Sequence, residues 1–90
     1  MTESQLQGKF IKYLEGRGHY VVKTIRVNKK GVPDLLICTN LGEFVGIEVK
    51  RCGFKQNTTL LQQYQIQEIN KAGGRAFVAD SIEDLKEKGL

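Results

Sequence analysis

The apolar positions near the start of the chain recur at the spacing of a helix. Residues 2–5 (TESQ) fit a capping box, in which the side chains of the first and fourth residues bond each other's backbone N–H groups. The apolar residues that follow on one helical face are Leu6, Phe10, Tyr13 and Leu14. Gly16 and Gly18 interrupt this pattern, so the sequence predicts a helix that ends there.

Three β-strands are predicted next. Residues 20–27 (YVVKTIRV) are rich in β-branched and aromatic side chains, which favour strands. Residues 34–39 (DLLICT) form a nearly continuous apolar run, as is typical of a central strand. Residues 43–50 (EFVGIEVK) alternate in their second half, which places Glu48 and Lys50 on the face opposite the apolar residues. The short turn between the last two strands predicts an antiparallel hairpin.

The remainder of the chain predicts a helix, a strand and a short helix. Residues 59–62 (TLLQ) form a second capping box. The apolar stripe of the helix that follows consists of Leu61, Ile66, Ile69 and Ala72. Residues 75–79 (RAFVA) predict a strand parallel to a neighbour, because a helical crossover precedes it. Residues 81–84 (SIED) can cap a final helix. This order predicts an α/β fold, a mixed sheet flanked by helices.

Length and composition indicate one globular domain, residues 1–90. No apolar stretch approaches the ~20 residues that span a bilayer, and the N-terminus lacks the features of a secretion signal. We therefore expect an intracellular, cytoplasmic protein without membrane contact. The net charge of +4 favours a phosphate-rich partner, although many proteins without one are equally basic. A single histidine, His19, argues against multi-histidine metal centres, and we expect Cys38 to be a small buried residue.

Glu48, Lys50 and Asp34 are the candidate catalytic residues. An E-x-K triplet alone has little meaning, but here both charged side chains share one face of a strand. Asp34 begins the hairpin partner of that strand and can lie beside them. Two neighbouring carboxylates repel each other unless a cation lies between them, and such oxygen ligands suit Mg²⁺ or Mn²⁺. A metal held there, with Lys50 orienting the attacking water, is suited to phosphodiester hydrolysis.

The segment before Asp34 makes this assignment more specific. Residues 31–34 (GVPD) form a G-x-P-D motif in which the proline directs the aspartate into its strand. G-x-P-D in one strand followed by E-x-K in the next resembles the PD-(D/E)-x-K superfamily, which has the restriction-endonuclease-like αβββαβ core. More narrowly, the chain resembles the VRR-NUC domains. In that family a Glu in the first helix, matched here by Glu3, and a Gln opening the later helix, matched by Gln62, belong to the same pattern.

The resemblance implies Mg²⁺- or Mn²⁺-dependent DNA cleavage. It assigns the metal to Asp34 and Glu48, with help from Glu3 and the backbone carbonyl of Val49, and it assigns the site glutamine to Gln62, with Gln65 as second choice. Small stand-alone members occur in phages and bacteria and resemble homodimeric resolvases of branched DNA such as four-way (Holliday) junctions. Paired cuts require two active sites, which a two-fold homodimer supplies.

Each candidate residue also has a simpler interpretation. Asp34 could cap a turn, and Glu48 with Lys50 could form an ion pair on a solvated strand face. Gln62 could only complete the capping box, and Glu3 could only favour a helix N-terminus. The predicted phosphate contacts could equally be solvated side chains; they are Lys23, Arg26, Lys29, Lys30, Arg51 and Lys55. Phe54 could stack on a base, although burial is the simpler expectation.

The leading hypothesis is a metal-dependent DNA endonuclease that recognises DNA shape. No segment is typical of a base-reading helix, which favours recognition of structure over sequence. One alternative is a non-catalytic nucleic-acid-binding module on the same fold, although a pure binder has no need of the two carboxylates and the lysine. Another is a small α/β protein whose basic face meets an acidic protein. Failure to bind DNA at low salt would favour that last alternative.

Overall fold

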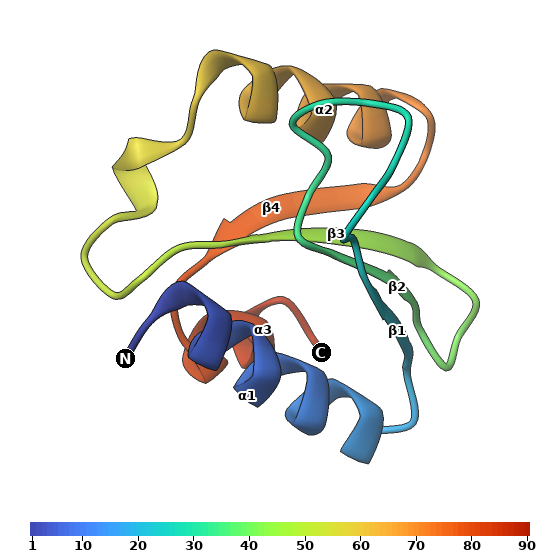
Figure 1. The fold of residues 1–90 in the computed structure, drawn as a ribbon. Coiled ribbons are helices and arrows are strands. Elements are labelled where there is room, and N and C mark those ends of the chain that lie inside the picture. Colours follow the sequence, from blue (N-terminus) through green and yellow to red (C-terminus); the bar gives the residue numbers. More distant parts are fainter.

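A four-stranded mixed sheet forms the centre of the computed structural model, which describes residues 1–90 (Figure 1). Its strands are β1 (Tyr20–Lys23), β2 (Leu35–Cys38), β3 (Phe44–Val49) and β4 (Arg75–Ala79), and they lie side by side in this order. β2 is antiparallel to both of its neighbours, β1 and β3, whereas β4 is parallel to β3. The predicted hairpin and the predicted parallel crossover are therefore both confirmed.

Helices lie on both faces of the sheet. α1 (Glu3–Gly16) and α3 (Ile82–Glu87) pack on one face, and α2 (Leu60–Lys71) lies across the other (Figure 1). A short 3-10 helix, η1 (Lys55–Asn57), interrupts the loop from β3 to α2. This arrangement confirms the predicted α/β class. None of the helices combines the length and apolar character needed to cross a bilayer.

The helices begin at the caps that the sequence predicts. In α1 the Gln5 N–H donates to the Thr2 hydroxyl at 3.0 Å and the Thr2 N–H donates to the Gln5 side chain at 2.8 Å. The same reciprocal pair, at 2.9 and 3.1 Å, joins Thr59 and Gln62 at the start of α2. The Ser81 hydroxyl caps α3. These bonds satisfy backbone N–H groups that have no partner within the helix, and they define the orientation of the first turn of α2.

The first predicted strand is shorter than expected. β1 ends at Lys23 rather than at residue 27, and the chain then forms a loop up to Pro33. The Thr24 N–H still donates to the Asp34 carbonyl at 2.9 Å, but the ladder stops there. Pro33 has no N–H to offer to a neighbouring strand, so β2 cannot extend backwards to pair with the second half of the predicted strand. Ile25 consequently remains 87% exposed.

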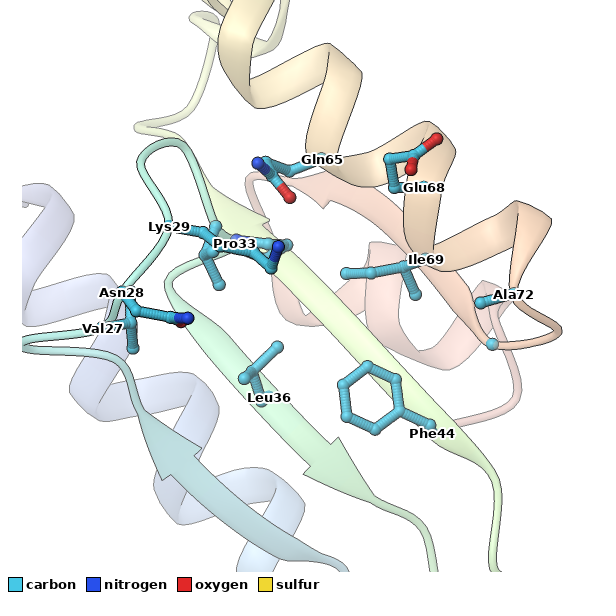
Figure 2. Close-up of a pocket in the computed structure, with 12 residues that line it drawn as sticks. Val27, Asn28, Lys29, Pro33, Leu36, Phe44, Gln65, Glu68, Ile69 and Ala72 are labelled. Carbon is cyan, nitrogen blue, oxygen red and sulfur yellow. The ribbon is translucent and has the colours of Figure 1, made fainter.

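α2 covers only part of its face of the sheet. It packs on β3 and β4, and none of its residues is fully buried, so the predicted apolar stripe is only partly buried. A groove of about 460 Å³ remains beside it, with Leu36 and Phe44 of the sheet facing Ile69 of α2 (Figure 2). Cys38 lies on the uncovered part of this face, since it pairs with Phe44 in the sheet. The prediction that Cys38 is buried was therefore wrong: it is exposed.

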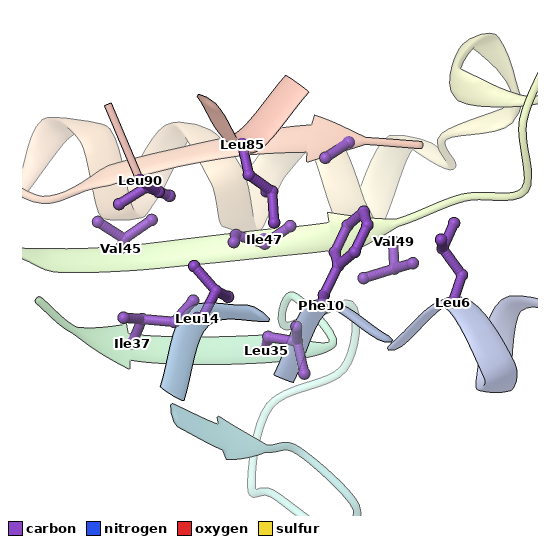
Figure 3. Close-up of a cluster of buried hydrophobic side chains, with 11 residues drawn as sticks. Leu6, Phe10, Leu14, Leu35, Ile37, Val45, Ile47, Val49, Leu85 and Leu90 are labelled. Atoms are coloured by element: carbon purple, nitrogen blue, oxygen red, sulfur yellow. The ribbon is translucent and has the colours of Figure 1, made fainter. Parts of the chain in front are cut away.

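The main hydrophobic core lies on the opposite face, between the sheet, α1 and α3 (Figure 3). Phe10 and Leu14 of α1 are completely buried there. The other members of this core are Leu6, Leu35, Ile37, Val45, Ile47, Val49, Ala79, Leu85 and Leu90. Because alternate residues of β3 point into this core, Glu48 must point to the other face, towards α2. The packing of the core thus determines where the charged residues of β3 lie.

Candidate active site

Asp34 lies immediately before β2 and beside the end of β3. The sheet register pairs Leu35 with Ile47, so in this antiparallel pair the residue before Leu35 falls opposite Glu48. The Val49 N–H donates to Asp34 Oδ2 at 2.9 Å, which holds the carboxylate in place. Two carboxylates from neighbouring strands are thereby brought together, as the sequence predicts.

Two glycines allow close packing around the segment that leads to Asp34. A Cβ atom on Gly46 would come within 3.1 Å of the Pro33 ring, so a side chain there would push Pro33 away from β3. Gly31 has φ +80°, and a Cβ atom there would lie 2.9 Å from the Leu61 backbone. The sequence does not reveal this close approach of Leu61 of α2 to Gly31. The loop before Asp34 is therefore held between β3 and the first turn of α2.

The side chains of Gln62 and Lys50 both reach Glu48. Gln62 Nε2 donates to Glu48 Oε2 at 3.0 Å, and Lys50 Nζ lies 3.9 Å from the same oxygen. The Oε1 atom of Gln62 meanwhile accepts from the Thr59 N–H at 2.9 Å. Gln62 thus completes the capping box and contacts the site at once, so the two interpretations are compatible. Gln65 faces the groove instead, which favours Gln62 as the site glutamine (Figure 2).

Glu48 is a buried carboxyl group with incomplete hydrogen bonding. Its residue is 3% exposed, and its Oε1 atom has no hydrogen-bond partner. The pKa of Glu48 is raised to about 8, first by burial and then by the negative charge of Asp34, whose effect is larger than the opposite effect of the Lys50 ammonium. The negative charge of Glu3 makes a smaller contribution in the same direction. At neutral pH the site therefore favours either a proton or another positive charge between its carboxyl groups.

The donor set of Asp34 and Glu48 fits a hard divalent cation. The unpartnered Oε1 of Glu48 is an available oxygen ligand, and Mg²⁺ is commonly held by one or two carboxylates together with water and phosphate oxygens. No group of three or more His, Cys, Asp or Glu side chains is placed to hold one ion. Glu3 therefore does not form a three-carboxylate set with Asp34 and Glu48 here, and its assistance in holding the metal stays a prediction. Ligation by the Val49 carbonyl stays a prediction.

The predicted phosphate contacts fall into three groups. The four from β1 and the loop before Asp34 are exposed and form no ion pair; they are Lys23, Arg26, Lys29 and Lys30. The Arg51 guanidinium lies 4.2 Å from the centre of the Phe54 ring, which is itself exposed rather than buried. Lys55 contacts Asp84 at 2.9 Å and Asp80 at 3.9 Å. Its charge is thus already partly neutralised, which makes it the weakest candidate for binding phosphate.

Several contacts that hold β4 against its neighbours have no signal in the sequence. Asn70 of α2 both donates to and accepts from the backbone of Ala76, at 3.3 and 2.8 Å. Arg75 forms a two-pronged ion pair with Glu43, at 2.9 and 3.0 Å. Arg75 and Glu43 are 32 residues apart in the chain, and only the completed fold brings them together. The bonds of Asn70 join the end of α2 to β4, the neighbour of β3.

Comparison with known proteins assigns this arrangement to a family. The sequence profile of the VRR-NUC domain matches residues 4–83. The chain belongs to the VRR-NUC domain family. A solved structure described as a VRR-NUC domain is similar to it with a TM-score of 0.79 and 25% sequence identity, over 97% of this chain and 94% of that one. No curated protein shows a significant match.

Membership in the VRR-NUC family makes this a nuclease-type domain and confirms the predicted restriction-endonuclease-like fold. The matched range contains Asp34, Glu48, Lys50 and Gln62. It begins one residue after Glu3, so the family match does not include the predicted first-helix glutamate. Within the matched range, the fold brings Asp34, Lys50 and Gln62 together around the buried carboxyl group of Glu48.

We expect the metal-free VRR-NUC domain to lose stability as pH rises from about 4.5 to about 8. The fold raises the pKa of Glu48, so the folded state holds this proton more tightly than the unfolded chain does. The resulting stabilisation is fully present below the ordinary pKa of 4.5 and is lost as pH rises through about 8. Thermal unfolding in EDTA, followed by circular dichroism across this pH range, measures the effect.

Glu48→Gln is the matched control for this measurement. The amide has the shape of the protonated acid and does not titrate, so the variant should unfold at a higher temperature than the wild type at the upper end of the range. Mg²⁺ added there should raise the unfolding temperature of the wild type but not of the variant. The same pH dependence in both proteins would show that Glu48 is not the titrating group.

Proposed function

We propose that this VRR-NUC domain is a divalent-metal-dependent DNA endonuclease. The observation that carries the proposal is the buried Glu48 carboxyl group, which meets Asp34, Lys50 and Gln62 and retains one unpartnered oxygen. Stabilisation of the fold does not explain this cluster, because the desolvation of buried charges costs more free energy than one ion pair of imperfect geometry recovers. A perturbed carboxyl group beside a lysine and a second carboxylate is typical of a catalytic site.

Asp34 and Glu48 would hold the cation, which would stabilise charge on the scissile phosphate and make water more acidic. The remaining chemistry comes from the chain itself. The Lys50 ammonium is 3.9 Å from Glu48, close enough to orient an attacking water or to stabilise charge that develops on the phosphate. Gln62 donates to Glu48 and fixes the direction of its carboxylate. Mg²⁺ and Mn²⁺ both suit this oxygen-rich donor set.

The proposed substrate is branched DNA, such as a four-way junction. Arg26 and Lys30, exposed cations of the loop that leads to Asp34, would bind phosphates beside the site. Phosphate contacts position DNA without reading its sequence, which suits recognition by shape. Symmetric cleavage of a junction needs two incisions at a fixed separation, and each chain carries one such site. We therefore propose that the active form is a homodimer.

A cleavage assay tests the catalytic proposal. End-labelled four-way junction, flap, duplex and single-stranded DNA are incubated with the protein in Mg²⁺, Mn²⁺ or EDTA. We expect cutting that depends on the metal and is strongest on the branched substrates. Lys50→Ala should lower kcat by about 100-fold or more, because it removes a charge that acts in the transition state. Asp34→Ala should abolish cleavage, because it removes a metal ligand.

Binding assays on the same substrates complete this test. Both variants should retain DNA affinity close to that of the wild type, since neither residue belongs to the exposed cations. Binding by the wild type without cutting in any metal would reject the enzyme and leave a non-catalytic binding module. No binding at low salt would reject both and favour an acidic protein partner.

The two contacts of Gln62 can be separated by mutation. Gln62→Ala removes both the capping bond and the bond to Glu48, whereas Thr59→Ala removes the hydroxyl half of the capping box and leaves Gln62 in place. Each should destabilise the protein by about 1 kcal/mol through loss of the cap. Only Gln62→Ala should also reduce kcat, by about tenfold or more at saturating substrate.

Gln65→Ala is the second control, because Gln65 lies three residues further along the same helix and faces the groove. It should leave kcat unchanged. A loss of kcat in Thr59→Ala equal to that in Gln62→Ala would show that Gln62 matters only for the helix. A loss in Gln65→Ala alone would transfer the site role to Gln65.

Lys30 and Lys55 form a matched pair for testing the phosphate contacts. Lys30 is exposed and forms no ion pair, whereas Lys55 binds Asp84. Lys30→Ala should weaken binding of every DNA substrate and reduce the slope of log affinity against log salt by about 1. Lys55→Ala should change this slope much less. Filter binding or fluorescence anisotropy over a salt series measures both, and equal slopes in the two variants would contradict the assignment.

A further inference from the structure

The part of the sheet that α2 leaves uncovered is an apolar surface. Across β1, β2 and β3, Tyr20, Cys38 and Phe44 form one row of directly paired neighbours. Val22 and Leu36 form the next row. Tyr20 is 70% exposed, Phe44 is 47% exposed and Val22 is 41% exposed. We call these five residues, together with Val27 at the mouth of the groove, the open sheet face.

The groove beside α2 joins this surface to the active site. Val27, Leu36 and Phe44 line it, together with Ile69 of α2 (Figure 2). The groove also reaches Pro33, the residue before Asp34. A partner seated on the open sheet face would therefore lie beside the catalytic cluster without covering the core side of the sheet.

We propose that the open sheet face is the surface through which a second copy of this chain binds. This inference rests on the proposed function, because paired incisions require two active sites at a fixed separation. A two-fold contact beside the active site would set that separation directly. The open sheet face contains no lysine or arginine, so it offers nothing to a phosphate backbone, and its chemistry suits a protein surface.

The exposed apolar area is sufficient for a dimer. At roughly 150–250 Å² for a whole aromatic side chain and somewhat less for valine, the exposed parts of Tyr20, Val22, Val27 and Phe44 amount to about 400 Å². Interfaces are about 60% apolar, so a footprint around this area measures about 650 Å² on each copy. The total of about 1,300 Å² lies within the range of specific interfaces.

The charges at the groove are compatible with a symmetric contact. Lys29 and Glu68 lie on opposite sides of the groove, and neither forms an ion pair within the chain. In a two-fold interface, a contact between one residue of the first copy and another residue of the second copy occurs twice, because the same two residues also meet with the copies exchanged. One unpaired charge of each sign is thus a pattern that a second copy can satisfy, whereas a uniformly basic or acidic partner cannot.

The two cysteines of the wild-type protein provide a chemical test in which one of them is the internal control. Both are free and exposed in the single chain, but Cys38 lies in the open sheet face, whereas Cys52 lies outside it in the loop after β3. The wild type is labelled with iodoacetamide and the two sites are followed by mass spectrometry. Light scattering on the same samples should give about twice the chain mass of 10.1 kDa.

Tyr20→Lys and Val22→Lys place a charge in the open sheet face, and Leu41→Lys is the matched control. Leu41 is 92% exposed in the β2–β3 turn, outside the open sheet face. We expect the first two variants to be folded monomers and the control to remain dimeric. Cys38 should react about tenfold more slowly in the wild type than in the Tyr20→Lys monomer, because only the dissociated fraction is accessible. Cys52 should react equally in both.

A monomeric wild type at micromolar concentration, or a dimer that both lysine variants leave intact, would overturn the proposal. Equal labelling of Cys38 in the wild type and the Tyr20→Lys variant would do the same. Cleavage assays distinguish this failure from failure of the proposed function: a monomer that still nicks DNA in Mg²⁺ rejects only the interface, whereas a dimer that cuts no substrate rejects only the nuclease. If both proposals hold, Tyr20→Lys should keep nicking activity and lose paired cleavage of four-way junctions.

Discussion

The burial of Glu48 on a strand that is covered on both faces is the constraint on which the site depends. One face of β3 belongs to the hydrophobic core, so its polar residues can only point towards α2. There the side chain of Glu48 meets Gln62 and Lys50, and the Asp34 carboxylate is held alongside by the Val49 N–H. The contacting groups come from α2, from the end of β3 and from the residue before β2. The site therefore exists only when the sheet register and the position of α2 are both correct.

Burying the Glu48 carboxylate beside Asp34 lowers the stability of the metal-free protein, and this loss indicates what the site is suited to bind. Glu48 loses hydration, faces a second carboxyl group and keeps one oxygen without a partner. One lysine at 3.9 Å does not compensate for these losses, as the raised pKa of Glu48 shows. A proton or a divalent cation would do so. The same electrostatic imbalance that lowers stability at high pH is what makes the cluster suitable for binding a cation beside a phosphate.

The two faces of the sheet serve different purposes because they are covered unequally. α1 and α3 cover one face, where their buried apolar residues pack against those of the sheet. α2 covers only the β3–β4 half of the other face, where its first turn carries Gln62. The uncovered half holds an apolar surface whose removal from water would be favourable. A domain of 90 residues has few elements available for this purpose, and a second copy provides the missing cover in the proposed dimer.

Local patterns in the sequence determine most of the elements and their order. Capping boxes, glycine stops and the alternation in residues 43–50 depend on near neighbours, and the structure has the helices and strands that they predict. The G-x-P-D and E-x-K motifs also identify the residues that meet in the site, because a hairpin joins them. Three features were decided by the tertiary structure alone: the early end of β1, the exposure of Cys38 and the dual contact of Gln62. Each depends on which other segments of the chain lie beside the residue in the fold, and that information is absent from any short stretch of chain.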